Sequence, residues 1–171
     1  MIKIIDEIRK AIKNKTYLSA LTLALTIPDI CSQVETGKED SDRWIYIDWF
    51  NKYIEKESFD LDIGEFKEQT FNGNMCYALR CKVLHNGNVE LQQTSRNLKI
   101  ELDHFQFTTP ESPEYFYGYK YVYLHSEDGT KKTVTIIAID YLCEIICEAA
   151  GNFYNNWMNK EDFLKHQINF I

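Results

Sequence analysis

The segment Val134-Thr-Ile-Ile-Ala-Ile-Asp-Tyr-Leu-Cys-Glu-Ile-Ile146 is the place where the chain changes from a strand pattern to a helix pattern. Val134-Thr-Ile136 alternates apolar and polar residues, which is typical of a β-strand. From Asp140 the apolar residues recur at helical spacing instead, and this pattern continues to about residue 160. The segment therefore predicts a small sheet that is followed by a long closing helix.

Helical patterns also precede the sheet. Isoleucine recurs at helical spacing in residues 2–13, and a second apolar pattern runs through residues 16–34. Pro28 interrupts the second pattern, so a kink or a separation into two pieces is expected there. A short helix is predicted near residues 63–69.

Two further helices are predicted from their end signals. Ser41 or Asp42 is expected to cap a helix rich in aromatic residues. A later helix should span about Met75 to His85 and stop at Asn86-Gly87-Asn88, a sequence typical of a left-handed helix end.

Alternating residues predict the strands of the sheet, at 98–102, 105–107, 119–123 and 134–136. Glu127-Asp-Gly129 is a plausible hairpin turn. We expect residues 97–138 to form a three-stranded antiparallel sheet. The predicted fold class is α+β and helix-dominated, with residues 1–171 as a single domain. A helical bundle of residues 1–95 and 139–160 would contain this sheet as an insertion before the last helix.

The composition is that of a globular protein of 171 residues, with 44% hydrophobic and 26% charged residues. A net charge of −7 argues against a protein that coats nucleic acid by charge alone, so any RNA contact should be local. The N-terminus lacks the apolar core of a signal peptide, and the apolar window Leu18–Ile27 is about half a membrane span. We therefore expect a cytoplasmic protein without a membrane segment.

The chain has five cysteines and no pair at a spacing typical of zinc sites. Cys143 and Cys147 could share a helix face, but two thiols alone make a poor metal site. We expect the cysteines to be buried apolar thiols, and we expect no metal and no cofactor. The chain also lacks a glycine-rich phosphate loop and a nucleophile elbow.

Arg80 and His85, in Cys76-Tyr-Ala-Leu-Arg-Cys-Lys-Val-Leu-His85, combine a permanent cation with a proton-shuttling imidazole. Arginine can hold a phosphate through two parallel hydrogen bonds, and histidine can transfer protons at cellular pH. On a regular α-helix, positions five apart differ by about 140° in rotation and about 7.5 Å in rise. A second copy across a twofold axis would bring the two residue types together more easily. The alternative is a solvated arginine and a histidine that caps the helix end.

The Arg80–His85 spacing resembles the R-x4–6-H motif of the HEPN superfamily, whose members include RNases of toxin–antitoxin, CRISPR and phage-defence systems. The resemblance implies a helical homodimer with Arg80 and His85 at the interface, and metal-independent endoribonuclease activity through attack of the RNA 2′-OH. A neutralising partner protein is possible in such a system. Other members have lost catalysis and bind nucleotides or mediate dimerisation, and Cys81 stands where many active members carry a polar residue.

Asp29 is an acid inside an apolar run. In the functional interpretation it pairs with Arg80 or orients His85. In the structural interpretation it caps a helix after Pro28 or faces water. Glu35 is a weaker candidate of the same kind. Asp48 is either functional or part of a polar helix face.

Three other histidines are expected to be surface or packing residues: His104, His125 and His166. An aromatic run beside Lys120 contains Tyr115, Phe116, Tyr117, Tyr119, Tyr121 and Tyr123. It would either cover a core or a dimer contact, or stack RNA bases.

Overall fold

A computed structural model describes residues 1–40, 42–54, 71–86, 98, 100, 102–125, 129 and 131–166, and at residues 85, 86 and 125 it describes the backbone alone. The α-helices are α1 (Ile2–Lys13), α2 (Tyr17–Ala24), α3 (Ile27–Thr36), α4 (Arg43–Tyr53), α5 (Gly73–Cys81) and α7 (Ile139–Asn156). A π-helix, η2 (Lys82–Asn86), continues α5, and a 3₁₀-helix, η3 (Lys160–His166), follows α7. The strands are β1 (His104–Thr108), β2 (Tyr119–His125) and β3 (Lys131–Ala138).

The predicted helix-dominated α+β class is confirmed for the described part of the chain. Asp42 caps α4 as predicted, because its Oδ1 accepts a hydrogen bond of 2.8 Å from the backbone N–H of Trp44. The helix expected near residues 63–69 and the helix end expected at Gly87-Asn88 lie outside the described residues.

The predicted separation at Pro28 is confirmed. α2 ends at Ala24 and α3 begins at Ile27, so Pro28 lies in the first turn of α3. Proline is tolerated there because first-turn N–H groups have no partner within the helix. Gly37 ends α3 in the left-handed conformation with a φ of 67°, which glycine adopts without a steric penalty.

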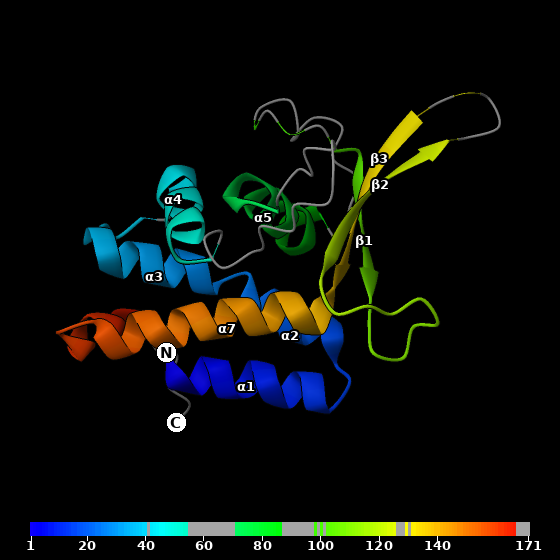
Figure 1. Cartoon of the computed structure of the whole chain (residues 1–171). Coiled ribbons are helices and arrows are strands. Elements are labelled where there is room, and N and C mark those ends of the chain that lie inside the picture. The colour runs from blue at the N-terminus through cyan, green and yellow to red at the C-terminus, as the bar shows by residue number, and fades with distance from the viewer. Residues whose placement is uncertain are drawn as a thin grey trace.

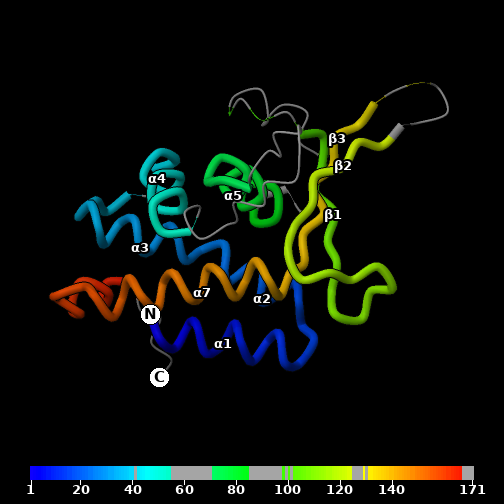
Figure 2. The backbone as a smooth tube through the Cα atoms, in the orientation of Figure 1, coloured from blue at the N-terminus to red at the C-terminus, as the bar shows by residue number. Residues whose placement is uncertain are grey.

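α7 is the helix around which the other helices assemble. It contacts α1, α2 and α3 along its length and β3 at its N-terminal end. Figure 1 shows α7 crossing the molecule between α1 on one side and α3, α4 and α5 on the other. The backbone trace shows the sheet at one end of this helical layer (Figure 2). The buried side of α7, including Leu142, Ile146 and Phe153, therefore forms the centre of the core.

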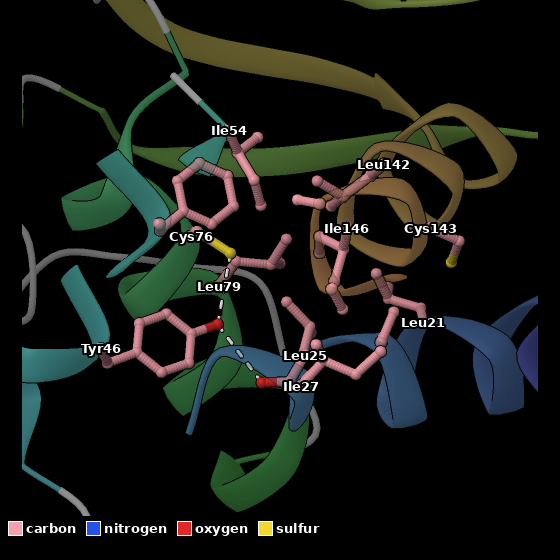
Figure 3. Packing of buried hydrophobic residues seen from close by; sticks show 14 of the residues in the cluster. Leu21, Leu25, Ile27, Tyr46, Ile54, Cys76, Leu79, Leu142, Cys143 and Ile146 are labelled. Carbon is pink, nitrogen blue, oxygen red and sulfur yellow. Dashed lines mark hydrogen bonds between the residues drawn. The ribbon is translucent and has the colours of Figure 1, made fainter. Parts of the chain in front are cut away.

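Tyr46 fixes α4 against two other helical segments. Its fully buried hydroxyl lies 3.3 Å from the carbonyl oxygen of Leu25 and 3.3 Å from Sγ of Cys76. Figure 3 shows both contacts, with Leu79 and Ile27 among the surrounding apolar side chains. Burial raises the pKa of Tyr46 well above its ordinary value, so the hydroxyl stays protonated and can donate to the carbonyl oxygen.

The predicted antiparallel sheet is wrong, because the observed sheet is mixed. Its strand order is β1-β3-β2, with β2 antiparallel to β3 and β1 parallel to β3. The predicted hairpin between β2 and β3 is confirmed by the pairing of His125 with Lys131. Alternation of side chains is the same in parallel and antiparallel strands, so the residue pattern could not distinguish the two arrangements.

The strand predicted at 105–107 is confirmed, because β1 spans His104–Thr108, but the strand predicted at 98–102 is wrong for its described residues. The described residues of the expected 98–102 strand are Leu98, Ile100 and Leu102, and none of them belongs to a strand. All three are buried in the core cluster. Their alternation therefore reflects core packing before β1, not strand pairing.

The connection of residues 109–118 explains the parallel pairing of β1 with β3. It leads the chain past the end of β3, from β1 at one edge to β2 at the other. The hydroxyl of Tyr115 donates to Oδ2 of Asp140 at 2.6 Å, and that of Tyr17 donates to Oε2 of Glu111 at 2.7 Å. These hydrogen bonds attach the connection to the first turn of α7 and to α2.

Within the described residues, one helical stretch, Tyr17–Thr36, is long and apolar enough by composition to cross a membrane. It comprises α2 and α3, and half of its most apolar window is buried inside the protein. Core helices of soluble proteins meet the same criterion.

Gly73→Ala should destabilise the protein by about 1–3 kcal/mol. The added Cβ would lie 2.5 Å from the backbone oxygen of Ile47 and 2.6 Å from Oδ1 of Asn51. The N–H of Gly73 donates to the same Asn51 oxygen at 2.6 Å, so separating α4 from α5 would break this hydrogen bond. The measurement is the free energy of unfolding in urea.

Gly151→Ala in α7 is the matched control. Its Cβ would meet the Ile5 Cδ1 atom at 3.9 Å, an ordinary contact. We expect this change to be neutral or to stabilise the protein by up to about 1 kcal/mol. Equal losses from the two glycine substitutions would contradict a special close approach at Gly73.

Candidate functional site

The structure brings two of the predicted site residues together, in an ion pair between α3 and α5. Nε of Arg80 donates to Oδ2 of Asp29 at 2.6 Å, although the residues are 51 positions apart in the sequence. Their side chains are 16% and 12% exposed, respectively, so the pair is largely withdrawn from water. The predicted pairing of Asp29 with Arg80 is therefore confirmed, and the alternative that Asp29 faces water is wrong.

One member of the pair lies at a favourable helix end. Asp29 is in the first turn of α3, where the helix dipole favours an anion. Arg80 is near the end of α5, but the helical chain continues beyond it as η2. The helix dipole therefore reinforces the charge of Asp29.

Aromatic rings complete the surroundings of Arg80. Its Cζ lies 5.8 Å from the ring centroid of Tyr46 and 5.8 Å from that of Tyr77, within range of cation–π attraction. Burial lowers the pKa of Arg80, but the charge of Asp29 and its hydrogen bond outweigh this and raise it above the ordinary value. The guanidinium is therefore a fixed, permanently charged group.

The hydrogen bond to Asp29 comes from Nε of Arg80, so it occupies only one edge of the guanidinium. The two terminal nitrogens form no further hydrogen bond with the described residues. A phosphate could accept two parallel hydrogen bonds from such a fork. The pair has no net charge, however, so phosphate binding would depend more on geometry than on attraction between net charges.

His85 lies within the π-helix η2, and its side chain is outside the described part of the structure. A π-helix has i→i+5 hydrogen bonds and is found mostly as single turns, often at functional sites. Its wider turn reduces the rotation between positions five apart from the value of about 140° in an α-helix. The backbone position of His85 is therefore rotated nearer to the helix face that carries Arg80 than regular α-helix geometry predicts.

The other acidic candidates do not contact the pair. Glu35 accepts hydrogen bonds from Lys52 and from Tyr53 instead, the latter at 2.7 Å. Asp48 is exposed on α4, as expected for a polar helix face.

The other histidines lie on other elements than Arg80. His104 lies in β1. His166 lies in η3, and burial lowers the pKa of the His166 imidazole. His125 lies in β2. The predicted catalytic roles of Arg80, His85 and Asp29 remain predictions.

Lys82 is a residue that the sequence analysis missed. It is 9% exposed at the start of η2, an unusual position for a lysine. One indication was present in the sequence, because Lys82 stands directly between Cys81 and the apolar residues Val83 and Leu84. Tyr46 and Tyr77 were likewise not singled out, since only the tertiary structure brings their rings to Arg80.

No group of three or more possible metal ligands is found among the described residues. A shallow pocket of about 410 Å³ lies elsewhere, between the end of α3 and η3, and is lined by residues such as Lys38, Glu39 and Asp162. Its mixed charges do not specify a ligand class, and the Arg80–Asp29 pair is not part of its lining.

Four of the five cysteines are buried as predicted: Cys31, Cys76, Cys143 and Cys147. Burial raises the pKa of Cys76 to about 12 and that of Cys147 to about 12. Cys81 is the partly exposed one, and it follows Arg80 directly. It can therefore report on access to the candidate site.

No protein-family model, no curated protein and no solved structure matches this chain.

Asp29→Ala should lower the free energy of unfolding by about 3–5 kcal/mol, because it leaves the largely buried Arg80 cation without its partner. The double variant Asp29→Leu/Arg80→Met should lose much less, since neither charge remains. Urea unfolding of Asp29→Leu, Arg80→Met and the double variant measures the coupling between the residues. If the losses simply add, the two side chains do not stabilise each other.

In the native protein, one thiol should react with a disulfide reagent at pH 8 much faster than the other four. Cys81→Ser should remove this fast phase, because burial keeps the other thiols protonated and inaccessible. The measurement is absorbance during stopped-flow mixing, with Cys147→Ser as the control that keeps the fast phase. A fast phase that survives Cys81→Ser would contradict the assignment.

Proposed function

We propose that the protein is a HEPN-like, metal-independent endoribonuclease that acts as a cytoplasmic homodimer. One observation carries the proposal: Arg80 is oriented by Asp29 at 2.6 Å, two residues before a π-helix that contains His85. A fixed guanidinium and an imidazole from one helical segment are the groups that RNA transesterification requires. A toxin or phage-defence setting, with a neutralising partner, belongs to the same proposal.

The chemistry divides among three residues. Arg80 holds the phosphate at the cleaved bond and stabilises the negative charge that develops on its oxygens. His85 removes the proton from the 2′-OH, or protonates the departing 5′-oxygen, so that a 2′,3′-cyclic phosphate forms and the chain breaks. Asp29 is a positioning residue, because its hydrogen bond to Nε leaves the terminal nitrogens of Arg80 for the phosphate.

The homodimer is supported by the low charge of the two segments that contain the pair. Residues 16–34 contain a single charged residue, Asp29, and α5 contains a single one, Arg80. Leu18 and Leu23 of α2 are nonetheless 68% and 37% exposed. Two copies that each carry a charge of −7 can approach most easily through surfaces without unpaired carboxylates, because a twofold contact places like residues near each other.

A non-catalytic binding module of the same fold is the second candidate. It is favoured by the neutralisation of Arg80, which is only 16% exposed and already bound to a carboxylate. Such a module would bind a nucleotide or a partner protein without cleaving RNA.

Wild-type protein should cleave single-stranded RNA in the presence of EDTA. His85→Gln should reduce the rate by about 100-fold or more, because the proton-transfer group is lost. Arg80→Lys should also reduce the rate strongly, since lysine keeps the charge facing Asp29 but cannot hold a phosphate bidentately. The measurement is the initial rate of cleavage of a labelled RNA, with analysis of the products for a 2′,3′-cyclic phosphate.

His104→Gln is the matched control for His85→Gln, and it should leave the rate unchanged. Melting temperatures confirm that each variant is folded, and light scattering gives the mass in solution. A wild-type chain that is monomeric and inactive with every RNA tested would favour the binding module. Cleavage that persists in His85→Gln would remove the proposed mechanism.

A further inference from the structure

The hairpin of β2 and β3 extends beyond the helical layer. Figure 1 shows this ribbon projecting away from α5 and α7. β1 pairs with residues 134–138 of β3. Asp103, directly before β1, accepts hydrogen bonds from the N–H and the hydroxyl of Thr133 through Oδ2. Tyr123 and Leu124, which pair with Thr133 and Lys132 near the outer end of the ribbon, are 51% and 46% exposed.

The ribbon differs in charge from the rest of the chain. β2 and β3 contain three lysines, Lys120, Lys131 and Lys132, and no acidic residue, in a chain with a net charge of −7. All three lysines are exposed. The turn acids Glu127 and Asp128 lie outside the described residues.

The two faces of the ribbon carry different side chains. Tyr123 pairs with Thr133, and Leu124 pairs with Lys132, so Tyr123 and Leu124 point to opposite faces. Lys131 lies on the Tyr123 face, with Nζ 3.7 Å from the ring centroid. Tyr121 packs against Tyr123 with ring centroids 5.5 Å apart. The Tyr123 face thus combines an aromatic ring with a cation, and the Leu124 face combines an aliphatic side chain with a cation.

We propose that the Tyr123 face of the hairpin binds single-stranded RNA, with a base that replaces Lys131 Nζ over the Tyr123 ring while Lys131 turns to a neighbouring phosphate. Bases stack on exposed aromatic rings regardless of sequence, and lysines hold the backbone that connects them. Among the macromolecules that lysines attract, RNA uses both the ring and the charge, whereas an acidic peptide requires only the charge. The choice of RNA rests on the proposed function, and the hairpin would hold the strand while the Arg80 site cleaves it.

The test uses the cleavage-deficient His85→Gln chain as background, so that RNA stays intact during the measurement. The probe is a fluorescein-labelled single-stranded RNA of about 20 nucleotides, and binding is followed by fluorescence anisotropy at fixed salt. Tyr123→Ala and Lys131→Gln should each weaken binding by about ten-fold. The matched controls, Leu124→Ala and Lys132→Gln, change neighbouring exposed residues on the opposite face and should weaken binding by less than about three-fold.

Three results would overturn the proposal. The first is an equal loss of RNA affinity from substitutions on the two faces. The second is no loss of affinity in either Tyr123→Ala or Lys131→Gln, and the third is equally tight binding of duplex RNA. Displacement of the RNA by an acidic peptide at a similar concentration would indicate a protein partner instead.

Cleavage by the wild-type chain is measured separately. Binding with no cleavage would end the nuclease proposal and keep this one, while cleavage with no face preference would do the reverse.

Discussion

The buried ion pair between Asp29 and Arg80 constrains the arrangement of the helices. α3 and α5 each carry little charge, and the acid of one helix faces the base of the other at 2.6 Å. A buried carboxylate or guanidinium without its partner is costly, so the two helices must meet at this point. Tyr46 of α4 contacts the end of α2 through the carbonyl oxygen of Leu25, and α5 through the thiol of Cys76. The relative positions of α3, α4 and α5 follow from these polar contacts within an apolar core.

The same pair gives the candidate site its chemical character. A guanidinium held through Nε keeps a defined direction, which a flexible surface arginine lacks. The π-helix that follows changes the rotation per residue in the segment that contains His85, whose imidazole would transfer the proton in the proposed mechanism. The features that stabilise the fold and the features that would serve catalysis are therefore not separate. This overlap is why charge-conserving changes at Arg80 are more informative than deletions.

The sheet adds a second chemical surface at the N-terminal end of α7. Its connection of residues 109–118 is fixed to the helical layer by Tyr115 and Asp140, while the outer hairpin is free of that layer. One part of the sheet is thus core and the other part is available for contacts. The aromatic run seen in the sequence divides within β2, because Tyr119 and Tyr121 pack against the core and Tyr123 is exposed.

The sequence by itself determined the elements whose cause is local. The break at Pro28, the cap at Asp42 and the hairpin between β2 and β3 depend on residues close in the chain, and all were predicted correctly. Only the tertiary structure decided the parallel pairing of β1, because side-chain alternation is the same for either direction. It also decided between the alternatives for Asp29, whose partner is 51 residues away. Contacts between distant residues depend on how whole helices pack, and local patterns carry no information about that packing.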